Sequence, residues 1–321
     1  MSVPTGRLAG AVAALPPSSF FVTSAVFHYL GPSLAVLLFA HVDVLGVAWL
    51  RIASAAVVFA LWRRPWRVLR AATPDRRRVL LALGAVLAAM NSLFYLAVDR
   101  LPLATVGAIE FLGTIVLAAA GARTRRNLLA LALAVGGVAV LTDVRLAGEP
   151  LGFAFAFANC AGFVLYVVLG HRVASSGAGP LGGIDQLGAA MVVAAVVATP
   201  IGLHQAAAAF GHPLWLAWGA GVGVCSSVVP YVTDQLAMAR LPRATFALML
   251  ALLPATATVI GLLVLAQVPT GRDLLGIVLV IAGLAAHQAA RPAGVPSLTR
   301  GRAPDAAGTA PRAARPRPGP A

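Results

Sequence analysis

Two ionisable residues and one amide stand in the middle of long apolar stretches of the sequence. They are Glu110, Arg51 and Asn91. An ionisable group is costly to bury in apolar surroundings, so such a residue usually faces a cavity or a partner. A carboxyl group in such a place can take up and release a proton, and we interpret Glu110 as a group that exchanges a proton and a ligand. The alternative is a permanently protonated carboxyl that only ties helices together.

Arg51 and Asn91 fall at the same depth as Glu110 if all three lie on helices. At a rise of about 1.5 Å per residue, Glu110 lies about 12 Å from the start of its helix. Arg51, counted from the start of its helix, and Asn91, counted from the end of its helix, both lie about 10 Å from the external face of the membrane. A guanidinium can bind a carboxylate through two parallel hydrogen bonds, which lowers the cost of both charges. Two interpretations of Arg51 stay open: an ion pair with Glu110, or a long side chain that extends to the outer interface of a membrane.

A second, weaker polar group surrounds Asp234, which follows Pro230 and Tyr231. A proline inside a helix has no N–H for the carbonyl one turn before it, so it should leave that carbonyl free. Tyr95, Tyr166 and Tyr231 could line a polar path with their hydroxyl groups, although tyrosines of apolar helices are also common as anchors at the membrane surface. Asp234 and the three tyrosines complete the candidate site residues.

The other polar and reactive residues give no sign of a metal site or of an enzyme. His28 and Asn159 are lone polar residues in apolar stretches, where a hydrogen bond between helices is the usual role. Cys160 and Cys225 also lie in apolar stretches, so we predict neither a disulfide nor a metal site. The histidines lack the spacing of metal ligands, and no phosphate-binding glycine loop occurs. We therefore expect no cofactor.

The composition requires a lipid surrounding. Of the 321 residues, 60% are hydrophobic and only 11% are charged, which no water-soluble domain would tolerate on its surface. The formal net charge of +14 is typical of nucleic-acid-binding proteins, but the basic residues lie in short breaks between apolar stretches and in the C-terminal tail. There they fit contacts with anionic lipid headgroups. We expect membrane lipids as partners and no nucleic acid.

Ten apolar windows are long enough to cross about 30 Å of hydrocarbon as helices. The sequence thus predicts an all-α integral membrane protein with ten transmembrane helices. The windows are residues 17–39, 44–62, 79–98, 102–120, 127–142, 151–170, 186–203, 214–238, 243–266 and 274–290.

The basic residues indicate how these helices are oriented. If the breaks alternate between the two sides of the membrane, the side with the N-terminus and the tail holds twenty of the twenty-four arginines, and the other side holds three. Cytoplasmic loops carry the excess of positive charge. We predict a multi-pass protein of the inner (plasma) membrane with both termini cytoplasmic. The longest cytoplasmic break, residues 63–78 with Trp62 and Trp66, contains seven arginines and should lie against the lipid headgroups.

A ten-residue motif occurs twice, 140 residues apart. Residues 96–105 read LAVDRLPLAT and residues 236–245 read LAMARLPRAT, with seven identical positions. The motif joins the third window to the fourth and the eighth to the ninth, so a five-helix unit occurs twice. Because five is odd, the second unit enters the membrane from the opposite side, as in many secondary transporters. The predicted parts are a cytoplasmic N-terminus (1–16), two inverted five-helix repeats (17–145 and 146–290) and a disordered cytoplasmic tail (291–321).

Several short segments within this layout carry a resemblance to a known family. They are Leu50-Arg51, MNSLFYL at 90–96, Leu101-Pro102, Ile109-Glu110-Phe111, Pro230-Tyr231 with Asp234, and Arg240-Leu241-Pro242. With these segments the sequence resembles the EamA-type transporters of the drug/metabolite transporter superfamily, and within it is most similar to inner-membrane threonine/homoserine exporters. The resemblance spans about residues 17–290.

The resemblance implies two inverted halves around a central cavity lined by the third, fourth, eighth and ninth helices, with Glu110 and Asn91 beside it. The family usually carries a Glu-Pro pair in the ninth helix, where this chain has Leu253-Pro254. A second family glutamate at the end of that helix appears here as Gln267. Glu110 is then the only acid of the fourth and ninth helices.

The function predicted from these observations is secondary active export of a small polar metabolite, an amino acid such as threonine or homoserine, driven by proton influx. An alternative keeps the fold and changes the cargo to an amphipathic, drug-like compound, since the missing carboxylate makes the second half of the cavity more apolar. A remote alternative is an integral-membrane enzyme or a scaffold. The expected partners are a small-molecule substrate and protons, and the sequence is compatible with a homodimer.

Overall fold

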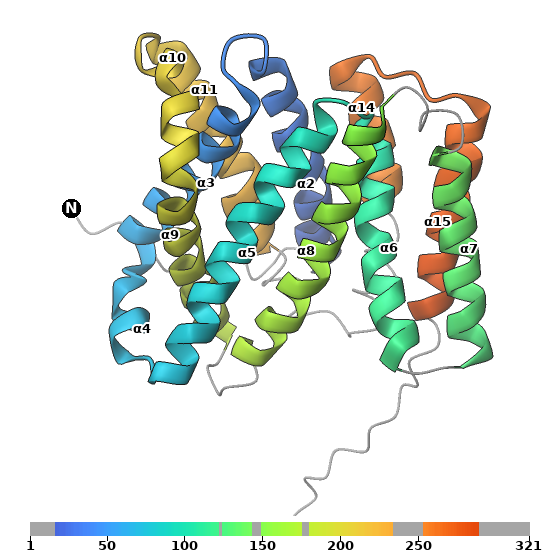
Figure 1. Cartoon of the computed structure of the whole chain (residues 1–321), viewed down its shortest axis with the longest axis horizontal. Coiled ribbons are helices and arrows are strands. Elements are labelled where there is room, and N and C mark those ends of the chain that lie inside the picture. Colours follow the sequence, from blue (N-terminus) through green and yellow to red (C-terminus); the bar gives the residue numbers. More distant parts are fainter. Residues whose placement is uncertain (1–16, 122–123, 143–148, 175–179, 234–252, 289–321) are drawn as a thin grey trace, which may run out of the picture. The chain divides into compact units, whose positions relative to one another are not determined.

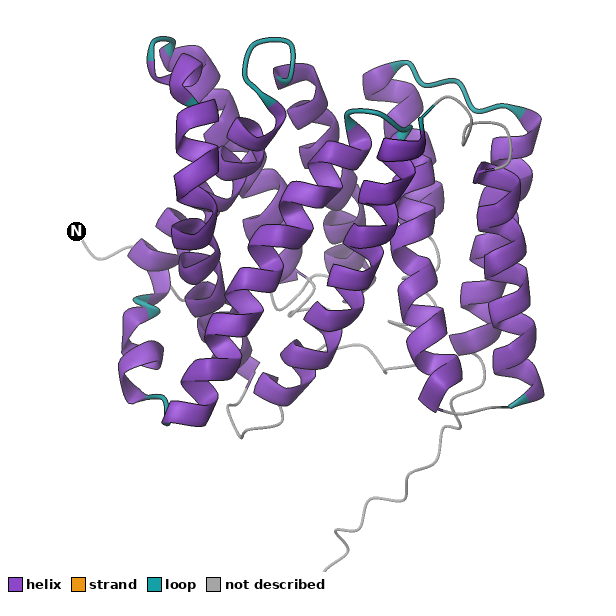
Figure 2. Cartoon of the chain, in the orientation of Figure 1, coloured by secondary structure: helices purple, strands orange, loops and turns teal. Residues whose placement is uncertain are grey.

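The regular structure follows the apolar windows of the sequence. The computed structural model describes residues 17–121, 124–142, 149–174, 180–233 and 253–288, and within these residues every regular element is helical (Figures 1 and 2). They all belong to one compact unit, residues 1–291. The N-terminus, the predicted disordered tail and the second copy of the repeated motif lie outside the described residues.

Several helices begin at a proline, whose missing N–H costs nothing in the first turn because no helical carbonyl precedes it there. The hydroxyl of Thr73 also accepts a hydrogen bond from the N–H of Arg76 at 3.4 Å, which caps the helix that follows. The helices are α2 (Pro17–Leu38), α3 (Val44–Arg63), α4 (Trp66–Ala71), α5 (Pro74–Val98), α6 (Leu103–Gly121), α7 (Arg125–Thr142), α8 (Pro150–Ala174), α9 (Pro180–Gln205), α10 (Ala207–Phe210), α11 (Pro213–Gly223), the π-helical turn η1 (Val224–Val228), α14 (Leu253–Leu265) and α15 (Gly271–Gln288).

Each of the ten apolar windows overlaps a helix of the described residues. Within these residues, five helical stretches are long and apolar enough to cross a membrane, namely Val44–Arg63, Pro74–Val98, Pro150–Gly170, Ile184–Gln205 and Pro213–Thr233. Shorter apolar helices are Val22–Leu38, Leu103–Gly113 and Leu253–Leu265. An all-helical protein with several membrane-crossing candidates is therefore confirmed, and the number of ten crossings stays a prediction.

Helices from distant parts of the chain form the core by packing against one another. α3 packs against α9, α7 against α15, and α5 against both α8 and α9. α2 packs against η1, α11 and α14, and α6 packs against α7, α8 and α14. A polar contact also joins helices far apart in the chain: the indole N–H of Trp49 on α3 donates to the hydroxyl of Thr199 on α9 at 2.9 Å.

The backbones of α7 and α15 meet at Gly137 and Gly276. A Cβ atom added to Gly137 would lie 2.6 Å from the carbonyl oxygen of Gly276, and one added to Gly276 would lie 2.8 Å from the carbonyl oxygen of Gly137. Small residues allow membrane helices to approach this closely. The neighbouring Gly136 has open space where its Cβ would be.

We expect Gly137→Ala to destabilise the protein by about 1–3 kcal/mol, because the added methyl group must push the two helices apart. Gly136→Ala adds the same methyl group one position earlier without a contact, so it should leave the stability unchanged or raise it slightly. Heating in detergent followed by size-exclusion chromatography measures the remaining folded protein. Equal melting temperatures for the two variants would contradict the close contact.

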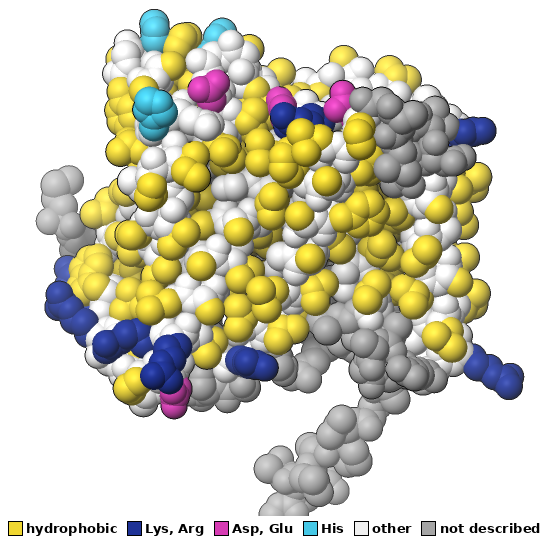
Figure 3. All heavy atoms as spheres, in the orientation of Figure 1, with side chains coloured by type: hydrophobic (Ala, Val, Ile, Leu, Met, Phe, Trp, Pro, Cys, Tyr) yellow, Lys and Arg dark blue, Asp and Glu magenta, His cyan; other side chains and the backbone are white. Residues whose placement is uncertain are grey.

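The surface is apolar between two polar ends. In Figure 3 hydrophobic side chains are spread over the face in view between its two ends, and several basic side chains gather at the lower left, where α4 lies. Leu61, Val196 and Leu263 are each more than two-thirds exposed, as suits side chains that face lipid. Trp62 and Trp66 are exposed beside the basic residues, which agrees with the predicted contact with headgroups.

Candidate functional site

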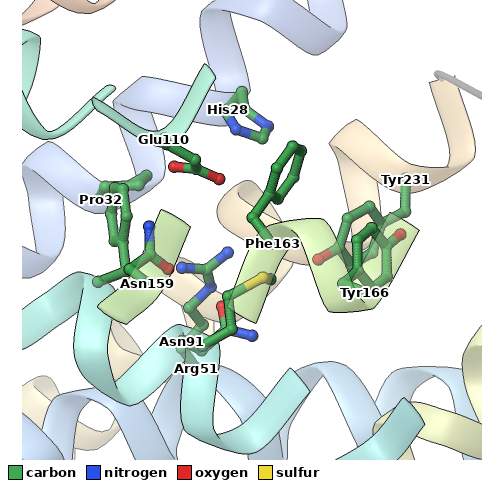
Figure 4. A pocket seen from close by; sticks show the side chains of 11 residues that line it. His28, Pro32, Arg51, Asn91, Glu110, Asn159, Phe163, Tyr166 and Tyr231 are labelled. Carbon is green, nitrogen blue, oxygen red and sulfur yellow. The ribbon is translucent and has the colours of Figure 1, made fainter. Parts of the chain in front are cut away.

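A small cavity lies between the helices. Its volume is about 50 Å³, room for about three or four waters at roughly 10–15 Å³ each. Polar and aromatic side chains line it from α2, α3, α5, α6, α8 and the helical residues after η1 (Figure 4). The lining residues are His28, Pro32, Arg51, Met90, Asn91, Phe94, Glu110, Asn159, Phe163, Tyr166 and Tyr231.

Arg51 is held by the helix that contains the π-helical turn. Pro230 cannot donate an N–H to the carbonyl four residues earlier, which is that of Ser226. The Nη2 of Arg51 donates to this carbonyl at 3.3 Å, and its Nε donates to the hydroxyl of Ser227 at 3.2 Å. Both serines lie in the π-helical turn η1. Such turns are frequent at functional sites of proteins. The carbonyl one turn before the proline is thus open to another donor, as the sequence predicts.

Neither interpretation of Arg51 from the sequence is correct. The residue is only 7% exposed, so its side chain does not extend to the outer interface. Among the described residues no ion pair joins Arg51 to Glu110, although the two opposite charges line the same cavity and attract each other. The guanidinium turns to η1 and lies 5.4 Å from the centroid of the Tyr95 ring.

Glu110 is carried by α6 and points its carboxyl group into the cavity (Figure 4). The residue is 5% exposed. His28 from α2 and Asn159 from α8 lie near the carboxyl group in this view. A carboxyl group that borders a cavity can exchange a proton with water or a ligand inside it, which a sealed carboxyl cannot. This geometry favours the functional interpretation of Glu110 over a purely structural one.

The two amides of the cavity differ in their hydrogen bonds. The Nδ2 of Asn91 donates to the carbonyl of Leu87, one turn earlier in α5, at 2.7 Å. Asn159 is 1% exposed, and in the described part of the chain neither atom of its amide has a hydrogen-bond partner of good geometry, although its Nδ2 lies beside the Glu110 carboxyl group. A buried polar group without a partner costs about 1–3 kcal/mol. Asn159 therefore suits a polar ligand better than a structural role.

Aromatic rings form the apolar part of the cavity wall. The ring of Phe163 packs edge-on against that of Phe111, with centroids 6.1 Å apart, and lies 6.0 Å from the ring of Tyr166. Tyr231 joins them from the helix after η1. Such rings keep bulk water out, which strengthens the attraction between charged groups inside the cavity.

Five of the predicted site residues line the cavity together, namely Glu110, Asn91, Arg51, Tyr166 and Tyr231. Tyr95 is fully buried and is absent from the lining residues, and its ring contacts Arg51 instead. Tyr95 thus contacts Arg51 without lining the cavity itself. Asp234 lies outside the described residues.

His28 and Asn159 line the cavity too, whereas the sequence favours a hydrogen bond between helices for both. The spacing of polar and aromatic residues on α8 could have indicated this position for Asn159. Asn159, Phe163 and Tyr166 are four and three residues apart, so they share one face of the helix. A polar residue and two aromatic residues on one face of a membrane-crossing helix indicate a cavity wall more than a lipid-facing surface.

The cavity differs from the one implied by the resemblance in the helices that line it. The first, second and sixth helices line it in addition to the third, fourth and eighth. The described part of the ninth helix, α14, contributes no lining residue. Leu253 is buried in the apolar core. The side-chain oxygen of Gln267 accepts a hydrogen bond from the N–H of Leu103 at 3.1 Å, which satisfies a free donor at the beginning of α6. Gln267 thus fixes the helix that carries Glu110.

Comparison with known proteins identifies the family. No family model matches the chain. The chain is 33% identical over 258 residues to the threonine/homoserine exporter RhtA of Salmonella typhimurium (strain SL1344), an alignment that covers 78% of this chain and 84% of the exporter. The threonine/homoserine exporter RhtA of Escherichia coli (strain K12) gives the same identity and coverage. A solved crystal structure with 20% identity has a TM-score of 0.49 and covers 85% of this chain and 98% of that chain.

An identity of 33% over most of both chains confirms the resemblance found in the sequence. The chain is therefore a transporter homologue and not an enzyme. Its apolar helices are those of a multi-pass membrane protein. The chain belongs to the family of RhtA-type threonine/homoserine exporters, which are EamA-type transporters of the drug/metabolite transporter superfamily.

Proposed function

We propose that this protein exports small polar amino acids such as threonine and homoserine, the substrates in the name of its relatives, through the cavity around Glu110 and Arg51. The observation that carries the proposal is the meeting of a buried carboxyl group, a buried guanidinium and two amides in one small cavity. Such a set of groups is costly inside a membrane and is kept where a polar solute passes.

The charges of the cavity match those of an amino acid. An α-amino acid carries one carboxylate and one ammonium group. Arg51 attracts the carboxylate, since guanidinium groups bind carboxylates through charge-assisted hydrogen bonds, and Glu110 attracts the ammonium group. Both residues line the cavity and are at most 7% exposed, so little water competes with the substrate.

The size of the cavity favours a small cargo. Sites for drug-sized ligands usually measure about 300–1,000 Å³, and the cavity here measures about 50 Å³. Even an amino acid requires some movement of the lining side chains, and a bulky amphipathic compound requires much more. The size supports export of an amino acid over the drug-like alternative.

We further propose that the ten helices form two inverted repeats, residues 17–145 and 146–290. Helix packing supports this division, because the second helix packs on the seventh (α3 on α9) and the fifth on the tenth (α7 on α15). The contact of the third helix with the sixth (α5 with α8) also has its counterpart in that of the eighth with the first (η1 with α2). Asn91 and Tyr231 stand 140 residues apart, like the two copies of the motif, and line the same cavity.

Proton influx is the proposed driving force, with Glu110 as the group that binds a proton and the substrate in turn. One charge that moves across 100 mV supplies about 2.3 kcal/mol, enough for a concentration ratio of tens. The distribution of arginines supports an inner-membrane protein with both termini cytoplasmic. In that orientation α4 and its basic residues face the cytoplasm.

A host that lacks its own threonine and homoserine exporters tests the proposal. Cells that carry this protein should grow at concentrations of threonine and homoserine that inhibit cells with an empty vector, and they should gain no protection against cationic dyes. Immunoblots of membrane fractions control for insertion. Protection against dyes but not against the amino acids, by protein present in the membrane, would contradict the proposal and favour a drug-like cargo.

A further inference from the structure

Asn159 is a polar residue of the cavity that the two charges of an amino acid leave unused. It lies on α8, is 1% exposed and shares its helix face with Phe163. Its Nδ2 lies beside the Glu110 carboxyl group, and its Oδ1 has no hydrogen-bond partner among the described residues. A buried oxygen in this state gains a hydrogen bond as soon as a donor enters the cavity.

Three other polar residues of the cavity already have a role. The amide of Asn91 donates to the carbonyl of Leu87 in its own helix. Arg51 and Glu110 match the carboxylate and the ammonium group of an amino acid. The remaining polar group of threonine and of homoserine is the side-chain hydroxyl, which can donate one hydrogen bond and therefore needs an acceptor such as the Oδ1 of Asn159.

We propose that Asn159 recognises the side-chain hydroxyl of the substrate and thereby determines the preference for hydroxy amino acids over apolar amino acids of the same size. The proposal rests on the proposed function. Valine has the shape of threonine with a methyl group in place of the hydroxyl. A site built to bind a hydroxyl rejects the analogue without it strongly, because a buried polar group of the site would stay unpaired.

Counterflow in liposomes measures this preference. Liposomes with purified protein are loaded with unlabelled threonine, and the entry of labelled threonine is inhibited with external threonine or valine. The wild type should prefer threonine over valine at least tenfold. Asn159→Leu should lower this preference at least tenfold, through weaker threonine transport with valine transport retained. Asn159→Ala removes the amide without adding bulk and should have the same effect if the leucine variant is poorly inserted.

Gln186→Leu is the matched control. Gln186 on α9 is also a buried amide, 4% exposed, and neither of its polar atoms has a hydrogen-bond partner among the described residues. It is not among the lining residues of the cavity. Its replacement should leave the ratio of threonine to valine transport unchanged.

Three results would count against the proposed role of Asn159. They are equal transport of threonine and valine by the wild type, an unchanged ratio in both Asn159 variants, and an equal loss of both amino acids in these variants. The last of these would assign Oδ1 to the ammonium group, which both amino acids carry. A wild type that transports valine or other amino acids but no threonine, or nothing at all, would overturn the proposed function itself.

Discussion

Glu110→Gln is expected to abolish coupled export of threonine and homoserine, with a loss of rate of at least about 100-fold, or about 2.7 kcal/mol. The carboxyl group is buried and points into the cavity. An amide of the same shape can neither release a proton nor balance the ammonium group of the substrate. Glutamine keeps the volume of glutamate and removes a costly buried acid, so the variant should fold and insert normally.

Growth on inhibitory threonine and efflux from liposomes under an imposed pH gradient measure the effect. Glu149→Gln is the control, since it makes the same change at an exposed acid just before α8, and it should export normally. Export by the Glu110 variant at the rate of the wild type would remove this residue from the mechanism. Exchange of threonine for threonine without any response to the pH gradient would restrict Glu110 to proton coupling.

Arg51→Met is expected to lower both transport, by at least tenfold, and thermal stability. The variant removes the donors that hold the Ser226 carbonyl and the Ser227 hydroxyl, and hydrogen bonds of charged groups contribute about 1.5–3 kcal/mol each. It also removes the positive charge proposed to attract the substrate carboxylate. Arg51→Lys keeps the charge but lacks the planar fork of donors, so it should recover part of the transport and little of the stability.

Melting in detergent and the KM for threonine in liposomes separate these two roles of Arg51. Loss of the contact with η1 lowers the melting temperature, and loss of the charge raises KM. Arg78→Met is the control, because the Arg78 side chain is 80% exposed and its ion pair is with the exposed Asp75. A methionine variant at position 51 that is as stable and as active as the wild type would contradict both roles.

Helix positions could be predicted from the sequence because apolar runs end where the chain must meet water. The differences lie at the ends that carry polar residues. α8 continues to Ala174, four residues beyond its window, and α9 begins at Pro180, six residues before its window. A helix can extend past the apolar region with residues such as Arg172 and Asp185, whose polarity ends a hydropathy window but not a helix.

The depth of the site residues could also be predicted, but not their partners. Counting along a helix brings Arg51, Asn91 and Glu110 to one level, and the structure brings all three to one cavity. The partner of Arg51 is Ser226, 175 positions later in the chain, and this contact depends on a π-helical turn that no apolar pattern indicates. Likewise, the spacing of Asn159, Phe163 and Tyr166 indicates that they share one face of α8, but only the packing of α8 against α5 and α6 shows that this face borders the cavity.

The π-helical turn at Val224–Val228 decides which way the rest of its helix faces. A turn closed one residue later than an α-helical turn rotates every following side chain by about 100° around the axis. Ser226 and Ser227 can therefore meet Arg51 while Tyr231, a few residues on, is directed to the cavity wall. The same helix shortened by one residue in this turn would carry Tyr231 about 100° away, and the cavity would lose one side of its aromatic wall. The extra residue of the π-helical turn thus sets the rotation between the two serines that bind Arg51 and the tyrosine that lines the cavity.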